Sequence, residues 1–175
     1  NCAVHRDLWE WWGETLFDAL DENQGINVSV FSGSEAELTG WLDSGLVDAV
    51  LGYGPITRAG VISEGVGADQ LILVSTNPDA PLRFDPGYIY VDYGEDFSQQ
   101  HMTFYADANS ARLTFNAPGP ALAFLLRSGG TAYLPARMLT EALAEERLHV
   151  LAAAPKFERP VFLNRKESAA IDGSI

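Results

Sequence analysis

The spacing of apolar residues changes repeatedly along the chain, between a three-to-four-residue period and short continuous or alternating runs. The first pattern predicts amphipathic helices, and the second predicts strands when turn residues bound it. The predicted helices are residues 7–22, 35–44, 98–105, 121–127 and 136–146. The predicted strands are residues 1–5, 26–31, 47–51, 71–74, 88–91, 111–115, 131–135, 147–151 and 154–163. This alternation predicts an α/β fold with a mainly parallel sheet.

Two predicted helices begin at residues with the spacing of an N-terminal cap, and the second also has a residue that predicts its end. Asp7 with Glu10, and Ser34 with Glu37, have the spacing of a capping box, in which each side chain bonds the backbone of the other residue. Gly45 follows the second helix and predicts its end, because glycine readily takes the left-handed conformation that closes helices.

Three tryptophans lie close together near the start of the first predicted helix. Trp9, Trp11 and Trp12 span about three-quarters of a helical turn, so they cannot all face one core. We expect at least one of them to be exposed in a monomer, and exposed aromatic side chains of this size often mark an interface. The alternative is that they pack beneath other segments of the protein.

Charge and composition exclude several functions. The net charge is −13, and residues 1–72 hold 12 acidic and two basic residues. Such a surface repels phosphate, so we expect any DNA contact to be made by a segment outside this chain. No apolar run reaches the length of a membrane span, and the N-terminus does not have the pattern of a signal peptide. The chain lacks an initiator Met, so we expect a processed protein or an excerpt, and a lone Cys2 favours the reducing cytoplasm.

No catalytic or metal-binding pattern is evident. His5, His101 and His149 fall on unrelated predicted elements, without the spacing of a metal site. The nucleophile-elbow pattern is absent, and Cys2 has no evident partner to activate it. We therefore expect no enzyme activity, no metal and no cofactor.

Three segments, in this order and spacing, resemble the effector-binding (regulatory) domain of LysR-type transcriptional regulators. They are the helix-to-strand pattern Leu42, Gly45, Leu46 and Asp48; the strand Asp69–Val74; and the pair Gly129–Gly130 followed by Tyr133–Pro135. The resemblance covers nearly the whole chain. It implies a two-lobed fold of the type II periplasmic-binding-protein kind with two hinge crossovers. Lobe I would comprise residues 1–72 and 155–175, and lobe II residues 73–154.

The resemblance also implies a function. A small-molecule effector would bind between the lobes and modulate DNA binding by an N-terminal helix-turn-helix domain that this chain lacks. The protein would be cytoplasmic and form a homodimer or homotetramer. The main alternative is a freestanding solute-binding protein of the same fold. An enzyme of related fold is a third reading, for which the sequence offers no catalytic cluster.

The predicted effector contacts follow strands or begin helices, because helix N-termini present free N–H groups and a partial positive charge. These predicted contacts are His5, Arg6, Asp7, Ser34, Tyr53, Gly54, Ser75, Thr76, Tyr93, Pro118, Gly119 and Tyr133. Arg6 and the helix N-termini favour an anionic effector, whereas Asp7 or Glu35 facing the ligand would favour a cation. The charge of the effector therefore stays open at this point.

The dimer interface implied by the resemblance joins the first helix and second strand of one protomer to lobe II of its partner. The predicted interface residues are Leu8, Trp11, Trp12, Ile26, Val28, Val30, Leu122 and Leu125.

Overall fold

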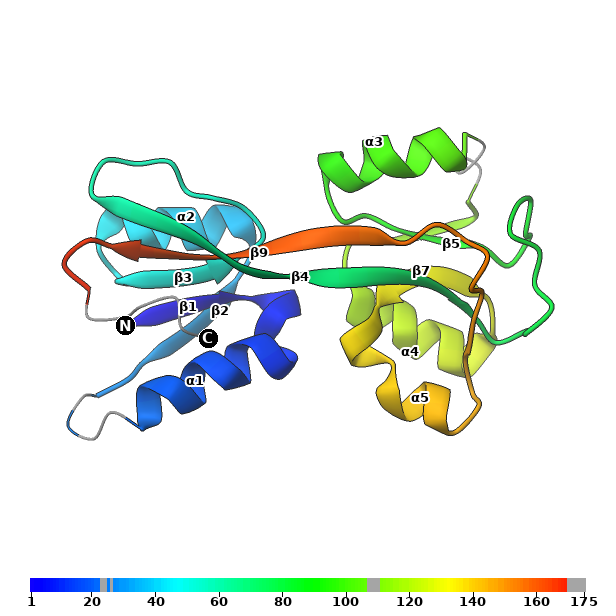
Figure 1. The fold of residues 1–175 in the computed structure, drawn as a ribbon, viewed down its shortest axis with the longest axis horizontal. Helices are drawn as coiled ribbons and strands as arrows, with labels where there is room; N and C mark the ends of the chain where they lie inside the picture. Colours follow the sequence, from blue (N-terminus) through cyan, green and yellow to red (C-terminus); the bar gives the residue numbers. More distant parts are fainter. Residues whose placement is uncertain (23–24, 26, 107–110, 170–175) are drawn as a thin grey trace. The chain divides into compact units, whose positions relative to one another are not determined.

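The structure, a computed structural model, describes residues 1–22, 25, 27–106 and 111–169 (Figure 1). The strands are β1 (Cys2–His5), β2 (Val30–Gly33), β3 (Ala49–Gly52), β4 (Val61–Ser75), β5 (Ile89–Val91), β6 (Leu113–Phe115), β7 (Thr131–Pro135), β8 (His149–Val150) and β9 (Phe157–Lys166). The helices are α1 (Glu14–Asp21), α2 (Glu35–Ser44), α3 (Glu95–Phe104), α4 (Pro118–Ser128) and α5 (Thr140–Ala144), with short helical segments η1 (Arg6–Leu8), η2 (Trp9–Gly13) and η4 (Ala136–Met138).

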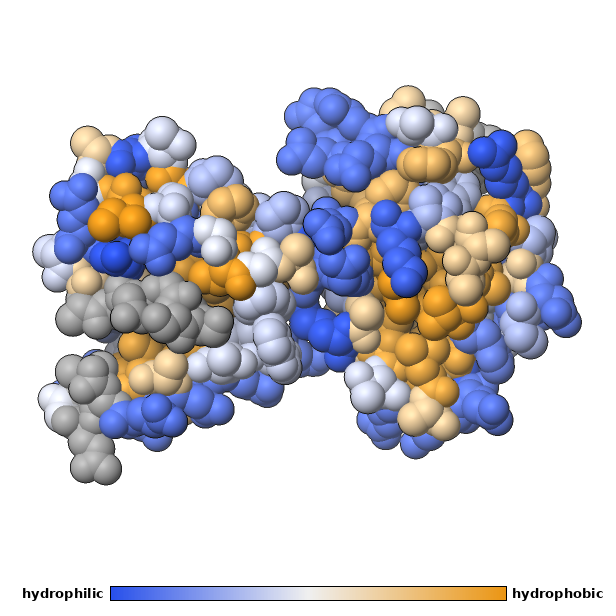
Figure 2. Space-filling view, in the orientation of Figure 1, coloured by the Kyte–Doolittle hydropathy of each residue, from blue (hydrophilic) through white to orange (hydrophobic). Residues whose placement is uncertain are grey.

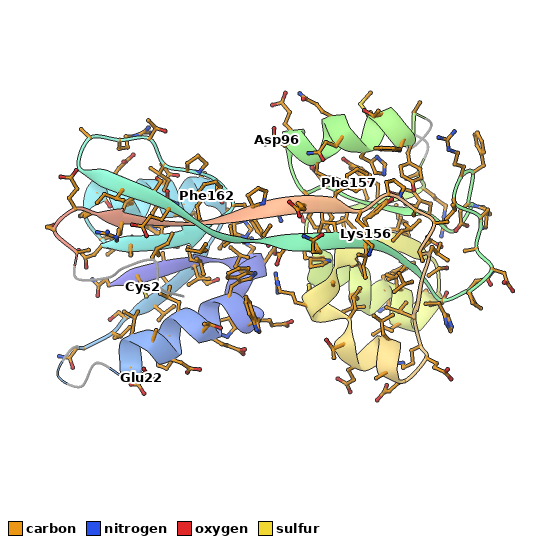
Figure 3. All side chains as sticks on the ribbon, viewed as in Figure 1. Cys2, Glu22, Asp96, Lys156, Phe157 and Phe162 are labelled. Carbon is orange, nitrogen blue, oxygen red and sulfur yellow. The ribbon has the colours of Figure 1, made fainter. Side chains whose placement is uncertain are left out.

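The chain forms two compact units. Unit 1 comprises Asn1–Ala68 and Pro160–Ile175, and unit 2 comprises Asp69–Arg159. β4 and β9 each have residues in both units. Figure 3 labels Phe157, which belongs to unit 2, and Phe162, which belongs to unit 1, on the same strand β9.

In unit 1, helices cover both faces of the sheet (Figure 1). β1 pairs in parallel with β2 and β3, and β9 pairs antiparallel with β3. Successive strand residues point to opposite faces, so Val4 packs with Leu16 of α1 in one cluster, whereas Ala3 packs with Leu38 of α2 in another. Because both faces of the sheet are buried, the sequences of β1 and β3 are continuous runs of mostly apolar residues.

The second helix has the termini that the sequence predicts. The Ser34 side chain accepts from the Glu37 backbone N–H and the Glu37 side chain accepts from the Ser34 backbone N–H, which completes the capping box. Gly45 ends α2 with a φ of 80° in the left-handed region. The predicted bounds of this helix, residues 35–44, are confirmed.

The first predicted helix is broken, and α1 begins only at Glu14. Trp11 has a φ of 68° and Glu10 has an extended conformation. The prediction of Asp7 as the N-cap is wrong, because Asp7 lies inside η1, whose N-cap is His5. At the break the Trp11 backbone N–H donates to Oε2 of Glu14 at 3.1 Å. Leu8 and Trp12 are both buried, whereas Trp11 is 55% exposed. The Trp12 ring lies against Gly67, where a Cβ atom would come within 2.5 Å of it.

Several other predicted bounds differ. β2 begins at Val30 rather than residue 26, and Ile26 lies outside the described residues. β4 extends back to Val61, in a stretch whose glycines and polar residues concealed a strand. α4 begins at Pro118, since proline is well tolerated in the first turn of a helix. The expectation of a mainly parallel sheet is wrong, because β3 with β9, and β4 with both β7 and β8, pair antiparallel.

Unit 2 is built around one apolar cluster. β4 pairs antiparallel with β7, from Leu71 opposite Pro135 to Ser75 opposite Thr131. β5 pairs in parallel with β6, and a parallel bridge joins Tyr88 to Thr131. α3, α4 and α5 contribute buried side chains to this cluster. In the view of Figure 2, unit 2, on the right, displays a larger hydrophobic (orange) area than unit 1.

Candidate functional site

Three parallel strands of unit 1 end side by side. His5, the last residue of β1, is in register with Gly33, the last residue of β2, and β3 ends at Gly52 next to them. η1, α2 and the loop that starts at Tyr53 follow these strand ends. We call this the carboxyl edge of unit 1. In α/β sheets the carboxyl ends of strands are where ligands usually bind.

His5 and Tyr53 lie in contact at this edge. Their ring centroids are 5.1 Å apart in an edge-to-face arrangement. His5 is 8% exposed, and its Nδ1 accepts a hydrogen bond from the Asp7 backbone N–H at 3.2 Å. Accepting this bond requires the neutral ring with its proton on Nε2. Two predicted contacts from distant parts of the chain thus share one place.

Arg6 does not present an uncompensated charge. Its guanidinium lies 3.1 Å from Oε2 of Glu37, and the same oxygen accepts from the Ser34 backbone N–H at 2.7 Å and from the Ser34 hydroxyl at 2.8 Å. The bond from the Ser34 backbone, with smaller contributions from its hydroxyl and Arg6, lowers the pKa of Glu37. These bonds are therefore complete above the ordinary pKa of a glutamate and are lost as the pH falls through the lowered value.

Glu35 lies over the strand end of β3. Its Oε1 is 3.1 Å from where a Cβ atom would stand on Gly52, and 3.6 Å from that position on Gly54. A Cβ atom on Gly52 would crowd the carboxylate, whereas one on Gly54 would be in ordinary contact with it. Asp7 adds a second acidic group, with a side chain 10% exposed. Asp7, Glu35 and Glu37 therefore outnumber Arg6 among the charged side chains named at this edge, and its net charge is negative.

Asn164 on β9 holds the loop after β3, a role that the sequence did not reveal. Its Oδ1 accepts from the Ile56 backbone N–H at 2.8 Å and from the Ser63 hydroxyl, and its Nδ2 donates to the Gly54 carbonyl oxygen at 3.0 Å. The residue is fully buried. Asn164 is more than a hundred residues from Gly54 in sequence, and nothing in the local pattern connects them.

We expect Asn164→Ala to lower the free energy of unfolding by about 2–3 kcal/mol, since it strands the Ile56 N–H and the Gly54 carbonyl in a buried place. Chemical denaturation measures this change. The matched control is Ser63→Ala, which leaves both backbone bonds to Asn164 in place and should cost about 1 kcal/mol. Equal losses in the two variants would contradict the role assigned to Asn164.

Unit 2 has a carboxyl edge of its own. β5, β6 and β7 end at Val91, Phe115 and Pro135, and α3, α4 and η4 begin just after them. Of the predicted contacts, Tyr93, Pro118 and Gly119 lie here. Tyr93 donates its hydroxyl proton to the Tyr133 carbonyl oxygen at 2.7 Å, and the Arg159 guanidinium lies 5.2 Å from the centroid of its ring.

Three predicted contacts of unit 2 lie elsewhere. Ser75 and Thr76 were expected at the hinge, but β4 enters unit 2 at Asp69, so they lie toward the opposite end of the strand. Tyr133 is 1% exposed, and its hydroxyl is bonded to the Tyr105 hydroxyl at 2.9 Å and to the Pro155 carbonyl oxygen at 2.8 Å. This placement makes Tyr133 part of the core of unit 2.

Some of the predicted interface residues are buried within their own unit, and others are exposed. Leu8, Trp12 and Leu125 are buried in the cores of their own units, so they are not available to a partner. Trp11 is exposed, and Val28, Val30 and Leu122 are partly exposed. Ile26 lies outside the described residues.

Within residues 1–22, 25, 27–106 and 111–169, no three His, Cys, Asp or Glu side chains are grouped so that they could hold a metal ion. The same part of the chain contains no helix with the length and apolarity needed to cross a membrane.

Comparison with known proteins identifies related domains. The family described as "LysR substrate binding domain" matches residues 11–172. The bromide-bound regulatory domain of HypT from Salmonella typhimurium is 16% identical, with a TM-score of 0.74 over 96% of this chain and 85% of that one. The C-terminal domains of a LysR family protein from Agrobacterium tumefaciens are also 16% identical, with a TM-score of 0.74 over 97% and 88%.

Full-length LysG from Corynebacterium glutamicum, solved with bound effector Arg, is 15% identical, with a TM-score of 0.71. The alignment covers 94% of this chain but only 60% of LysG. No curated protein sequence matches the chain.

Proposed function

Because this chain belongs to the family of LysR substrate-binding domains, the effector-binding regulatory domains of LysR-type transcriptional regulators, we propose that its effector carries a positive charge and binds at the carboxyl edge of unit 1. The family has the type II periplasmic-binding-protein-like fold, as the sequence predicted, and its domains regulate transcription without enzyme activity. The family also favours the regulatory domain over the freestanding solute-binding protein.

The observation that carries the proposal is the negative charge of the edge. The Glu35 carboxylate lies over Gly52 and Gly54, the Asp7 carboxylate lies 3.8 Å from Nδ1 of His5, and Arg6 is already engaged by Glu37. A ligand ammonium or guanidinium group would form charge-assisted hydrogen bonds with these carboxylates. The Tyr53 ring offers a face for the same cation. The arginine effector named for LysG is of this chemical class.

Further contacts and assembly belong to the same proposal. The contacts proposed at this edge are His5, Arg6, Asp7, Ser34, Tyr53 and Gly54, with residues 1–72 plus 155–175 and 73–154 as the two lobes. The domain acts in the cytoplasm as a homodimer or homotetramer, and a helix-turn-helix domain outside this chain contacts DNA. Trp11 is the described tryptophan best placed to contact a partner, since it is the most exposed of the three near the N-terminus.

A thermal-shift screen tests the charge of the effector. Arginine, lysine and agmatine are compared with succinate and glutarate on the 175-residue chain. A ligand at 100 times its Kd adds about 2.7 kcal/mol of stability, which raises Tm by roughly 5–10 °C for a domain of this size. We expect the shift with the cationic compounds. A shift with the dicarboxylates alone would contradict the proposal.

Glu35→Gln then locates the site. It removes one carboxylate without changing side-chain size, and we expect it to weaken binding of the best cationic compound by about tenfold, or 1.4 kcal/mol. Isothermal titration calorimetry measures this change. Glu167→Gln is the control, because it makes the same charge change at an exposed place elsewhere in unit 1. Equal affinity for the two variants would place the site elsewhere.

A further inference from the structure

Unit 2 contains a pocket at the end opposite its carboxyl edge. Its volume is about 260 Å³, and its walls include Tyr88 at the start of β5 and Thr131 at the start of β7. The loop of residues 81–86 and the side chains of Tyr105 and Arg112 complete it. We call this the distal pocket. A cavity of about 150 Å³ can hold a benzene ring, so this volume suits one ring with a polar substituent.

The loop that forms one wall is held in place by Asp85. Oδ1 of Asp85 accepts from the Gly87 backbone N–H at 2.8 Å, and Oδ2 accepts from the Thr131 hydroxyl at 2.6 Å. The Thr131 backbone N–H donates to the Gly87 carbonyl oxygen at 3.0 Å. The Asp85 carboxylate is therefore used within the protein, and the loop is tied to the sheet on both sides of Pro86.

The charged side chains that line the distal pocket are Arg83, Arg112 and Asp85, so its net charge is positive. Arg83 and Arg112 both line the distal pocket, and neither forms an ion pair with another residue in the described part of the chain. Residues 73–146 contain only four basic residues against nine acidic ones, so two of these four line a single pocket. In a chain of net charge −13, this concentration of arginine selects for an anion.

Two tyrosines, Tyr88 and Tyr105, form an aromatic wall of the pocket. The rings of Tyr88 and Tyr105 are stacked 6.2 Å apart with an angle of 11° between their planes. The Tyr88 hydroxyl lies 2.6 Å from Nε2 of His101, and the Tyr105 hydroxyl 2.9 Å from that of Tyr133. Burial raises the pKa of Tyr88, so the hydroxyl of this residue stays protonated. Both hydroxyls are engaged inside unit 2 and both rings also stack on His101, so an apolar ligand would meet the parts of the Tyr88 and Tyr105 rings that line the pocket.

Phe84, which also lines this pocket, has an exposed side chain and an uncommon backbone conformation. It is 79% exposed, and its φ is 55°, in the left-handed region that non-glycine residues rarely occupy. Such strain occurs most often at functional sites. An apolar ligand in the pocket would give the exposed ring a surface to cover.

From these observations we propose that the distal pocket is a second small-molecule site, which binds an aromatic carboxylate between the Arg83 and Arg112 guanidinium groups and the Tyr88–Tyr105 wall. Arginine pairs well with carboxylate because its planar group can donate two parallel hydrogen bonds. The ligand ring would lie against the tyrosines and Phe84. This site lies within unit 2 and has the opposite charge preference from the carboxyl edge of unit 1.

Benzoate is the probe that tests this site, and NMR titration of the 175-residue chain is the measurement. We expect a Kd on the order of 1 mM, which is ordinary for a ligand of this size, with shifts concentrated at the amides of Gly87, Tyr88, Arg112 and Thr131. Benzylamine keeps the ring and reverses the charge, and acetate keeps the charge and lacks the ring. Both should bind at least tenfold more weakly.

Two substitutions examine the arginines. Arg83→Gln and Arg112→Gln should each weaken benzoate binding about five- to tenfold, and the double variant should abolish measurable binding. Both side chains are exposed, so the variants are expected to fold normally, and their Tm values check this. Arg147→Gln is the control, since it makes the same charge change in unit 2 away from the pocket.

The possible results of these titrations distinguish a correct proposal from a wrong one. Shifts at the distal pocket that disappear in the double variant but persist in the control support the proposal. Benzylamine binding as well as benzoate, shifts elsewhere in unit 2, or unchanged affinity in the double variant would each overturn it. Because the cationic effector is tested with Glu35→Gln in unit 1, failure of either proposal leaves the other intact.

Discussion

Asp69→Asn is expected to lower the free energy of unfolding by about 3 kcal/mol, because it leaves the Arg137 guanidinium without its anion in a mostly buried place. Asp69 is the first residue of unit 2, and it is 3% exposed. Arg137 donates to it through two nitrogens, Nε to Oδ1 at 2.8 Å and Nη2 to Oδ2 at 3.1 Å. This two-point pair ties the start of unit 2 to the segment that follows β7. Urea denaturation measures the loss.

A second variant identifies the cause of that loss. Asp69→Asn combined with Arg137→Met removes the stranded charge, so it should recover part of the lost stability. Glu145→Gln is the matched control, since it breaks the exposed pair between Glu145 and Arg147 at 3.7 Å and should cost less than about 0.5 kcal/mol. If the double variant were less stable than Asp69→Asn alone, the stranded charge would not be the reason.

Gly130→Ala is also expected to destabilise unit 2 by about 3 kcal/mol, from backbone strain together with overpacking. Gly130 has a φ of 139°, and a Cβ atom on it would lie 2.8 Å from the Gly87 carbonyl oxygen and 3.1 Å from a methyl group of Leu125. Its own carbonyl oxygen accepts from the Thr76 backbone N–H at 3.1 Å, so the backbone cannot move away freely. Thermal and urea unfolding report this change.

Gly119→Ala provides the comparison. Gly119 lies in the first turn of α4, where a Cβ atom would meet nothing within 4 Å. Alanine is the better helix former, so this change should raise stability by about 0.5 kcal/mol. If Gly130→Ala were as well tolerated as Gly119→Ala, the close approach to the Gly87 carbonyl would not constrain the fold.

Elements with their signals in adjacent residues were predicted well. The bounds of α2 follow from Ser34, Glu37 and Gly45, which act through hydrogen bonds and dihedral angles a few residues apart. β7 followed in the same way from the Gly129–Gly130 pair and the apolar run that ends at Pro135. Local chemistry decides such elements, so the sequence contains the information in a short window.

Elements shaped by distant contacts were predicted poorly. The spacing of Trp9, Trp12 and Leu16 indicated one continuous helix, yet the chain breaks at Trp11. The Trp12 ring lies against Gly67, which is more than fifty positions away, so neighbouring residues alone do not determine the environment of this segment. The first half of β4 was missed for a related reason, because its glycines and polar residues form a strand only through pairing with other segments.

The same division holds for the candidate sites. The sequence by itself determined the family, the acidic character of unit 1 and the residues at strand ends such as His5 and Tyr53, because these depend on residue type and local order. Only the tertiary structure decided that Glu37 neutralises Arg6, that Tyr133 is a core residue, and that Arg83 and Arg112 line one pocket. The physical reason is that charge pairing and burial depend on distances between side chains, and residues far apart in the sequence acquire those distances only when the chain folds.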